Sequence, residues 1–213
     1  MDENRIFPNG EYFHICNKSI SNYHIFRKNK SIERFLLAVN YYNNQEVNVS
    51  LSKALRDELI LPEIMEKRNN GIFSLLAYCV MPDHYHLLLR MISDYSLAKF
   101  MNNIEGSYSH YYNLLNMRKG PLWQSRFRAS IIEDNETLLH VHRYIHLNPT
   151  TAGLVDKPIK WPWSSYRYFI KDRQALSIHK EISITSVAIY KQFVNNQINY
   201  QRTIKGIRRK LLE

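Results

Sequence analysis

The stretch YCVMPDHYHLLLR, residues 78–90, contains a strand-breaking segment, MPD at 81–83, between two apolar segments. Two histidines follow this break directly. GIFSLLAYCV (71–80) precedes the break and HYHLLLRM (84–91) follows it. Pro82 fixes its own φ angle and has no backbone N–H to donate, so it interrupts a strand. Two apolar strands joined by a short break predict an antiparallel hairpin over residues 72–91.

The hydrophobic patterns on either side of the hairpin extend it to a complete fold. A strand and then a helix are expected before it, and a helix and then a strand after it; these segments are 11–17, 31–44, 96–116 and 126–132. The order β-α-β-β-α-β is the ferredoxin-like split βαβ pattern of the α+β class. That pattern predicts an antiparallel sheet with helices on one face.

A further helix is expected over residues 134–149, in the segment DNETLLHVHRYIHLNP. Asp134 suits its N-cap, and Pro149 is expected to end it. Tyr144 and Asn148 are four residues apart, so they share one face of this helix.

The chain divides into a main domain at residues 1–169 and a basic, helical tail at 170–213. Residues 45–70 are polar and are expected to form an insert in the main domain. The 213 residues suffice for a domain of ordinary size with its own core.

The charge balance favours a polyanionic partner. Lys and Arg total 29 and Asp and Glu total 19, a formal net charge of +10, which fits nucleic acid first and an anionic membrane surface second. The apolar runs are much shorter than the ~20 residues that cross a bilayer, and the acidic N-terminus does not resemble a signal peptide. Cys16 and Cys79 make neither a disulfide framework nor a zinc site by themselves, so a cytoplasmic location is expected.

His84 and His86 are two residues apart on a strand, so both side chains point to the same face. Together they could bind one metal ion, or they could be two satisfied core histidines. A zinc hydrolase needs three protein ligands and a water, and no H-E-x-x-H motif supplies them here.

The helix at 134–149 could complete the site by bringing Tyr144 and Asn148 to the two histidines. Two imidazoles and an amide are neutral ligands, which suit an ion whose other ligands are phosphate oxygens, as with Mg²⁺ or Mn²⁺. The positive charge of the chain points to the phosphates of a nucleic acid. A phenol beside such an ion is a candidate nucleophile.

Five segments in this order resemble the single-tyrosine HUH transposases, and among them the REP-associated tyrosine transposases: VMPDHYHLLL, SYSHYYN, GPLWQSRFR, RYIHLNPTTAGLV and WPWSSYRYF. The resemblance covers roughly residues 10–169. It implies that His84 and His86 hold Mg²⁺ or Mn²⁺ and that Tyr144 is the nucleophile. Asn148 would replace the third ligand, often glutamine, with a side chain one methylene shorter.

The activity that the resemblance implies is cleavage and rejoining of single-stranded or hairpin DNA through a 5′-phosphotyrosine intermediate. Such proteins are mostly bacterial, so the expected location is the nucleoid, and both a monomer and a homodimer remain open. The candidate DNA-binding residues are basic or aromatic: Lys18, Arg27, Trp123, Arg126, Arg128 and Arg143.

Two other functions remain open from the residues. The chain could be a domesticated protein that binds hairpin DNA without cleaving it, although both histidines and the tyrosine are kept. It could also be a metal-dependent hydrolase of a small molecule. The lack of carboxylate ligands and the net charge of +10 argue against the hydrolase.

Overall fold

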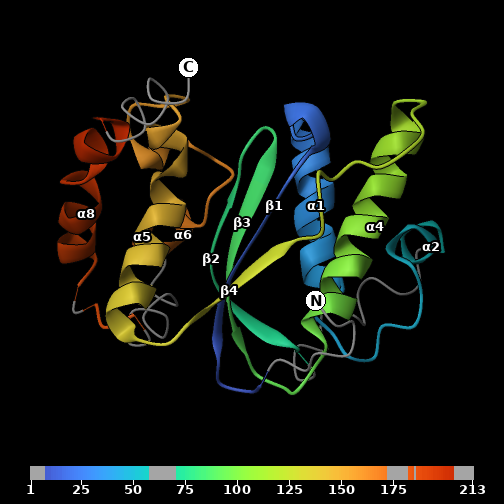
Figure 1. Ribbon diagram of the computed structural model, residues 1–213, viewed down its shortest axis with the longest axis horizontal. Helices are drawn as coiled ribbons and strands as arrows, with labels where there is room; N and C mark the ends of the chain where they lie inside the picture. The colour runs from blue at the N-terminus through green and yellow to red at the C-terminus, as the bar shows by residue number, and fades with distance from the viewer. Residues whose placement is uncertain (1–7, 58–70, 172–181, 185, 204–213) are drawn as a thin grey trace.

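A four-stranded antiparallel sheet forms the centre of the computed structural model, which describes residues 8–57, 71–171, 182–184 and 186–203 (Figure 1). The strand order is β2-β3-β1-β4. The strands are β1 (Tyr12–Lys18), β2 (Phe73–Val80), β3 (His84–Met91) and β4 (Arg128–Ile132). The labelled α-helices in the described residues are α1 (Asn29–Tyr41), α2 (Leu51–Arg56), α4 (Leu97–Leu115), α5 (Asn135–Thr151), α6 (Tyr166–Lys171) and α8 (Val187–Asn195).

The predicted α+β, ferredoxin-like arrangement is confirmed. The elements β1-α1-β2-β3-α4-β4 follow one another in the split βαβ order, and α1 and α4 lie together on one face of the sheet (Figure 1). The additional helix α5 covers the opposite face, with α8 on its outer side and α6 beside it (Figure 1). The sheet is therefore buried between two hydrophobic layers.

Alternation along the strands separates these two layers. On β1, Phe13 and Ile15 point into the core formed with α1 and α4, whereas His14 and Cys16 point towards α5. The neighbouring strand β3 has the same alternation, because Cys16 lies directly opposite His86 across the antiparallel pair. The face towards α5 consequently carries a strip of histidine and cysteine side chains, His14, Cys16 and His86, in place of a continuous apolar surface.

Helix α5 begins as predicted and ends later than predicted. The side chain of Asp134 accepts a hydrogen bond from the backbone N–H of Thr137, which confirms it as the N-cap. Pro149 does not end the helix, which continues to Thr151. A proline so close to the C-terminus costs one backbone hydrogen bond, and the last turn is still held by the bond from Ala152 N to Asn148 O.

Helix α8 packs on α5 through a buried tyrosine. The hydroxyl of Tyr190 lies 2.6 Å from His142 Nδ1 and 2.7 Å from His146 Nδ1. His146 Nε2 is in turn 2.8 Å from Ser165 Oγ, just before α6. This chain of polar contacts links α5 with α6 and α8 inside an otherwise apolar layer.

Two predicted segments are described only in part. The polar insert at 45–70 contains α2, and residues 58–70 lie outside the described residues. The tail after residue 170 contains α8 and a further helical turn at 198–203, whereas 204–213 lie outside the described residues. No helix in the described ranges is long and apolar enough to cross a bilayer.

A carboxyl group is buried beneath the paired strands β1 and β3. Glu105 on α4 accepts hydrogen bonds from Tyr85 Oη and from Asn17 Nδ2, and 8% of the residue is exposed. Burial raises its pKa to about 7, against the lowering effect of these two hydrogen bonds. The folded chain therefore keeps a proton on Glu105 up to a pH at which an unfolded chain has lost it.

We predict that Glu105→Gln changes how stability depends on pH. Between pH ~4.5 and ~7 the folded state binds the extra proton, so Glu105 lowers the free energy of unfolding as the pH rises. The neutral Gln removes this contribution, on the order of 1–3 kcal/mol across that range. Urea denaturation of both proteins at several pH values measures the difference between their free energies of unfolding. The contributions of the buried histidines are the same in both proteins and cancel in this difference. Parallel pH profiles would contradict the assignment.

Candidate metal centre

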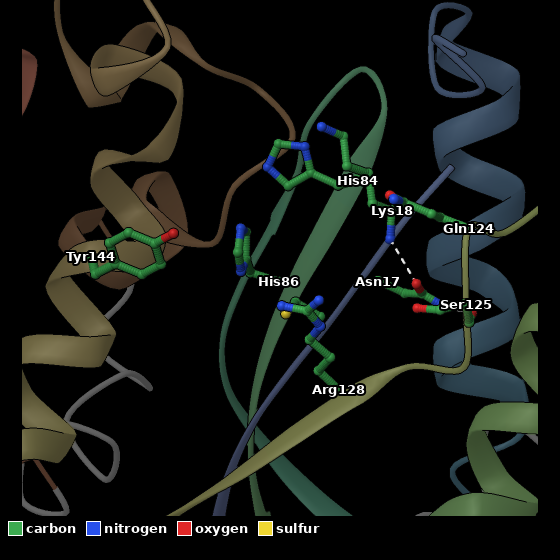
Figure 2. A pocket seen from close by; sticks show the side chains of 9 residues that line it. Asn17, Lys18, His84, His86, Gln124, Ser125, Arg128 and Tyr144 are labelled. Carbon is green, nitrogen blue, oxygen red and sulfur yellow. Dashed lines mark hydrogen bonds between the residues drawn. The ribbon is translucent and has the colours of Figure 1, made fainter. Parts of the chain in front are cut away.

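A cleft of about 440 Å³ lies between the α5-facing side of the sheet and α5 itself (Figure 2). Strands β1 and β3 supply its floor and α5 supplies one wall. Its lining residues are Cys16, Asn17, Lys18, His84, His86, Gln124, Ser125, Arg128 and Tyr144. The cleft thus unites both predicted histidines with the predicted tyrosine.

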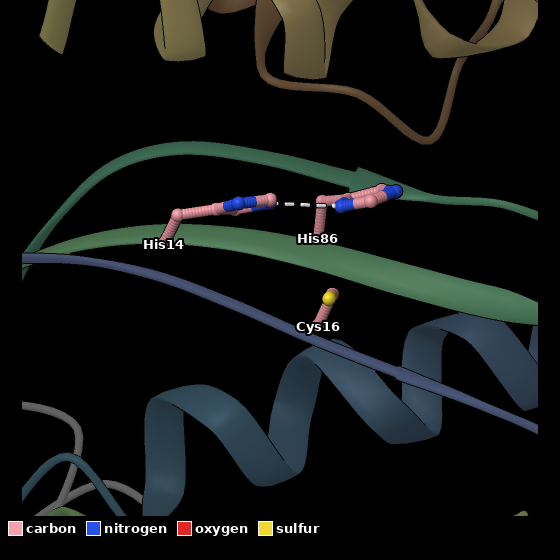
Figure 3. A group of neighbouring side chains, drawn as sticks. All are labelled: His14, Cys16 and His86. Atoms are coloured by element: carbon pink, nitrogen blue, oxygen red, sulfur yellow. Dashed lines mark hydrogen bonds between the residues drawn. The ribbon is translucent and has the colours of Figure 1, made fainter. Parts of the chain in front are cut away.

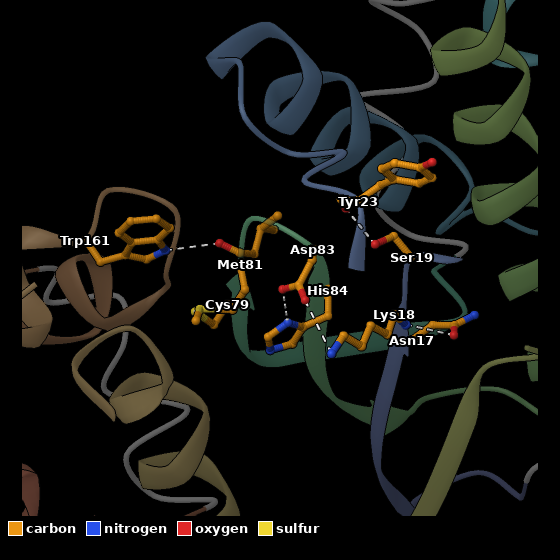
Figure 4. Close-up of polar contacts among 10 residues, drawn as sticks. Asn17, Lys18, Ser19, Tyr23, Cys79, Met81, Asp83, His84 and Trp161 are labelled. Atoms are coloured by element: carbon orange, nitrogen blue, oxygen red, sulfur yellow. Dashed lines mark hydrogen bonds and ion pairs between the residues drawn. The ribbon is translucent and has the colours of Figure 1, made fainter. Parts of the chain in front are cut away.

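His84 is held by the preceding residue in a defined tautomer. Its Nδ1 is 2.6 Å from Asp83 Oδ1, and Lys18 Nζ is 3.4 Å from Asp83 Oδ2 (Figure 4). Burial alone would raise the pKa of Asp83, but the hydrogen bond from His84 and the charges of His84 and Lys18 lower it to about 2. An ionised carboxylate can only accept, so in the neutral form of His84 the proton is on Nδ1 and Nε2 keeps the lone pair that a metal requires.

His86 is neutral and contacts a second histidine. Its Nδ1 lies 2.9 Å from Nε2 of His14, and the two rings stack at 5.1 Å. Burial, helped by the neighbouring His84 and His14, lowers the pKa of His86 well below its usual value. Burial likewise lowers the pKa of His14 to about 4. Both imidazoles are therefore uncharged at neutral pH, and when His86 donates to His14 its Nε2 is available as a ligand.

Tyr144 faces the histidines from α5. Its ring centroid is 5.5 Å from that of His86 and 6.1 Å from that of His14, edge-on in both cases. The residue is 41% exposed. The hydroxyl end points into the cleft (Figure 2), so the phenol is accessible from solvent.

Asn148 does not line the cleft. Its side-chain amide donates to the backbone carbonyl of Tyr144 at 3.1 Å, one helical turn back. The common face predicted for Tyr144 and Asn148 is present, but the short asparagine side chain is turned along the helix. Its role as a metal ligand remains a prediction.

The six predicted DNA-binding residues separate into three groups. Lys18 and Arg128 line the cleft, while Arg27 and Arg126 are exposed outside its lining. Trp123 and Arg143 are turned into the protein. Trp123 Nε1 donates to Glu105 O, and its half-buried ring packs against the core beside α4. Arg143 lies 4.0 Å over the ring of Phe193 and donates to His140 Nδ1.

Two residues of this site escape a reading of the sequence. His14 and Cys16 lie on β1, and their ligand atoms and that of His86 all lie within 4.8 Å of one another (Figure 3). The signal was present in the sequence as an H-x-C pair with strand spacing, in addition to the H-x-H pair of His84 and His86. It gains meaning only when β1 is known to pair with β3 in the register that puts Cys16 opposite His86.

The family model and the curated relative that match this chain are both described as transposases. Residues 50–148 match the family model described as "Transposase IS200 like". A Haemophilus influenzae protein named as a REP-associated tyrosine transposase is 28% identical over 109 residues, which are 46% of this chain. The match spans 62% of the length of that relative.

The fold also matches a solved structure, that of a REP-associated tyrosine transposase bound to a REP hairpin. The TM-score is 0.56 at 17% identity, over 81% of this chain and 86% of the other. At this identity the match shows a common fold.

We predict that Asp83→Asn weakens binding of Mn²⁺ by about 10–100-fold, because the amide no longer fixes the tautomer of His84. Electron paramagnetic resonance of free Mn²⁺ measures the affinity. Asp156→Asn is the matched control, since Asp156 is an exposed acid paired with Lys160. Equal Mn²⁺ affinities in the two variants would show that the hydrogen bond from His84 to Asp83 does not contribute to metal binding.

Proposed function

Because this chain matches the IS200-like transposases over residues 50–148 and resembles the REP-associated tyrosine transposases, we propose that it cleaves and rejoins DNA strands in the cleft between β1, β3 and α5. Its substrate would be single-stranded or hairpin DNA, in which the nucleophile can reach one backbone. The observation that carries the proposal is the edge-on approach of Tyr144 to His86, at 5.5 Å between ring centroids.

The histidines supply the metal ligands in this proposal. His84, with its Nδ1 tied to Asp83, and neutral His86 would each present Nε2 to Mg²⁺ or Mn²⁺. Such an ion, when bound, neutralises charge on the scissile phosphate. Asn148 would join them as a third ligand if its amide exchanged the bond to Tyr144 O for one towards the cleft.

Tyr144 carries the covalent step. Its oxygen attacks the phosphorus and forms a 5′-phosphotyrosine, while the bond to the 3′ oxygen breaks; the phenol loses a proton and the leaving 3′ oxygen gains one. A 3′-OH later attacks the same phosphorus and releases the tyrosine. Each step exchanges one phosphodiester for another, so no nucleotide cofactor is needed.

Lys18 and Arg128 give the cleft its positive charge and would contact backbone phosphates of the strand. Lys18 is already paired with Asp83, so it also links phosphate binding to the position of His84. Arg128 lies opposite Cys16 on β4 and extends from the floor of the cleft.

We predict that Tyr144→Phe folds and binds hairpin DNA but forms no covalent adduct. The substitution removes one exposed oxygen and should leave packing unchanged. Labelled hairpin oligonucleotides with Mn²⁺, separated on a denaturing gel, reveal the adduct. Tyr168→Phe, which alters another exposed tyrosine, should keep it. An adduct on Tyr111 or Tyr112 would show that Tyr144 is not the nucleophile. Hairpin binding without any adduct in the unmodified protein would indicate a protein that binds DNA without cleaving it.

We also predict that Arg128→Ala makes binding of single-stranded DNA less sensitive to salt. Losing one phosphate contact should reduce the slope of log K against log [salt] by about 0.7. Fluorescence anisotropy at several salt concentrations gives the slope. Lys191→Ala removes the same charge from the exposed side of α8 and should leave it unchanged. Equal losses in both variants would point to a general effect of net charge.

A further inference from the structure

We propose that His14, Cys16 and His86 form a second metal site, which takes a thiophilic divalent ion of the zinc class and competes for His86 with the Mg²⁺ or Mn²⁺ site. The existence of the site is independent of the function proposed above. The competition rests on that function, since it requires His86 to serve both ions.

The site follows from the pairing of two strands. His14 and Cys16 are two apart on β1 and point to the same side of the sheet. Cys16 is the direct cross-strand neighbour of His86 on β3. His14 Nε2 and His86 Nδ1 are 2.9 Å apart and point at each other, with the cysteine sulfur beside them (Figure 3).

The distances fit one small ion after slight movement. Metal–nitrogen bonds of ~2.0–2.1 Å and metal–sulfur bonds of ~2.3 Å put the ligand atoms of a tetrahedral zinc ion roughly 3.3–3.6 Å apart. The three atoms here all lie within 4.8 Å of one another. Small side-chain rotations would therefore open the contact between His14 and His86 and bring the sulfur of Cys16 closer.

The donor set selects the kind of ion. Two imidazole nitrogens and a thiolate suit Zn²⁺ and similar ions, whereas Mg²⁺ prefers oxygen ligands. Three protein ligands leave the fourth tetrahedral position open. The thiol gives up its proton on binding. Burial raises the pKa of the Cys16 thiol, and the nearby positive charge of Arg128 opposes that rise.

His86 can bind only one ion at a time, because only one of the two nitrogens of a neutral imidazole has a free lone pair. A neutral imidazole has one nitrogen with a lone pair and one that carries a proton. An ion held with His14 and Cys16 uses Nδ1 of His86, so the proton moves to Nε2. That nitrogen is the one that an ion shared with His84 requires, because Nδ1 faces His14.

Titration with Co²⁺, a spectroscopic substitute for Zn²⁺, tests the site directly. A cobalt–thiolate bond produces a charge-transfer band in the near ultraviolet, and the chain has two cysteines. The band should appear in the unmodified protein and in Cys79→Ala, which alters the fully buried cysteine. It should be absent in Cys16→Ala, and His14→Ala should weaken Co²⁺ binding at least about tenfold.

Circular dichroism confirms that each variant is folded, and Cys16→Ser provides a second, more conservative replacement. The proposal is overturned if the unmodified protein shows no charge-transfer band, or if the band survives in Cys16→Ala and disappears in Cys79→Ala.

Competition is measured by adding Zn²⁺ to protein loaded with Mn²⁺ and following the release of Mn²⁺ by electron paramagnetic resonance. We expect one Mn²⁺ to leave for each Zn²⁺ bound, and Cys16→Ala to require at least about tenfold more Zn²⁺. Simultaneous binding of both ions would overturn the competition. A cobalt band in a protein that never binds Mn²⁺ would support the thiolate site and contradict the metal assignment of the proposed function.

Discussion

The antiparallel pairing of β1 with β3 is the constraint on which the site depends. It fixes Cys16 opposite His86 and Lys18 opposite His84, so the candidate metal ligands of the floor, His14, Cys16, His84 and His86, come from two adjacent strands. The apolar residues on the other face maintain this register, because a shift by one residue would turn Ile15 and Leu87 out of the core. The geometry of the site is therefore held by the hydrophobic effect acting on the opposite side of the same strands.

Helix α5 adds the one component that the sheet cannot provide. Its inner side packs on β2 and β3, and its outer side is bound by Tyr190 of α8 through two histidines that precede and follow Tyr144 by two residues. Packing on two sides limits rotation of the helix about its axis. The phenol can then be exposed to solvent and still have a defined direction towards the strands.

The sequence was sufficient for the order of elements and for much of the site. Strand 84–91 has the predicted ends, and the two-residue period put His84 and His86 on a common face. The contribution of β1 required knowledge of strand order and register, which no local pattern contains. Residue type makes Trp123 and Arg143 candidates for DNA binding, which stays a prediction; the contacts that they make with the core and with Phe193 depend on packing that forms only in the folded chain.

Tyr85, between the two histidines, has its hydroxyl on the opposite face of the sheet, against the carboxyl of Glu105, to which Asn17 also donates. These three buried residues satisfy one another's polar atoms, so a change at one of them alters the hydrogen bonding of the other two. A relative with an aliphatic residue at the middle position would leave the carboxyl with one donor fewer, at a cost of about 1–3 kcal/mol. Divergence at position 85 should consequently be accompanied by an apolar residue at position 105, and the polarity of the α4 core should vary together with the centre of the histidine motif.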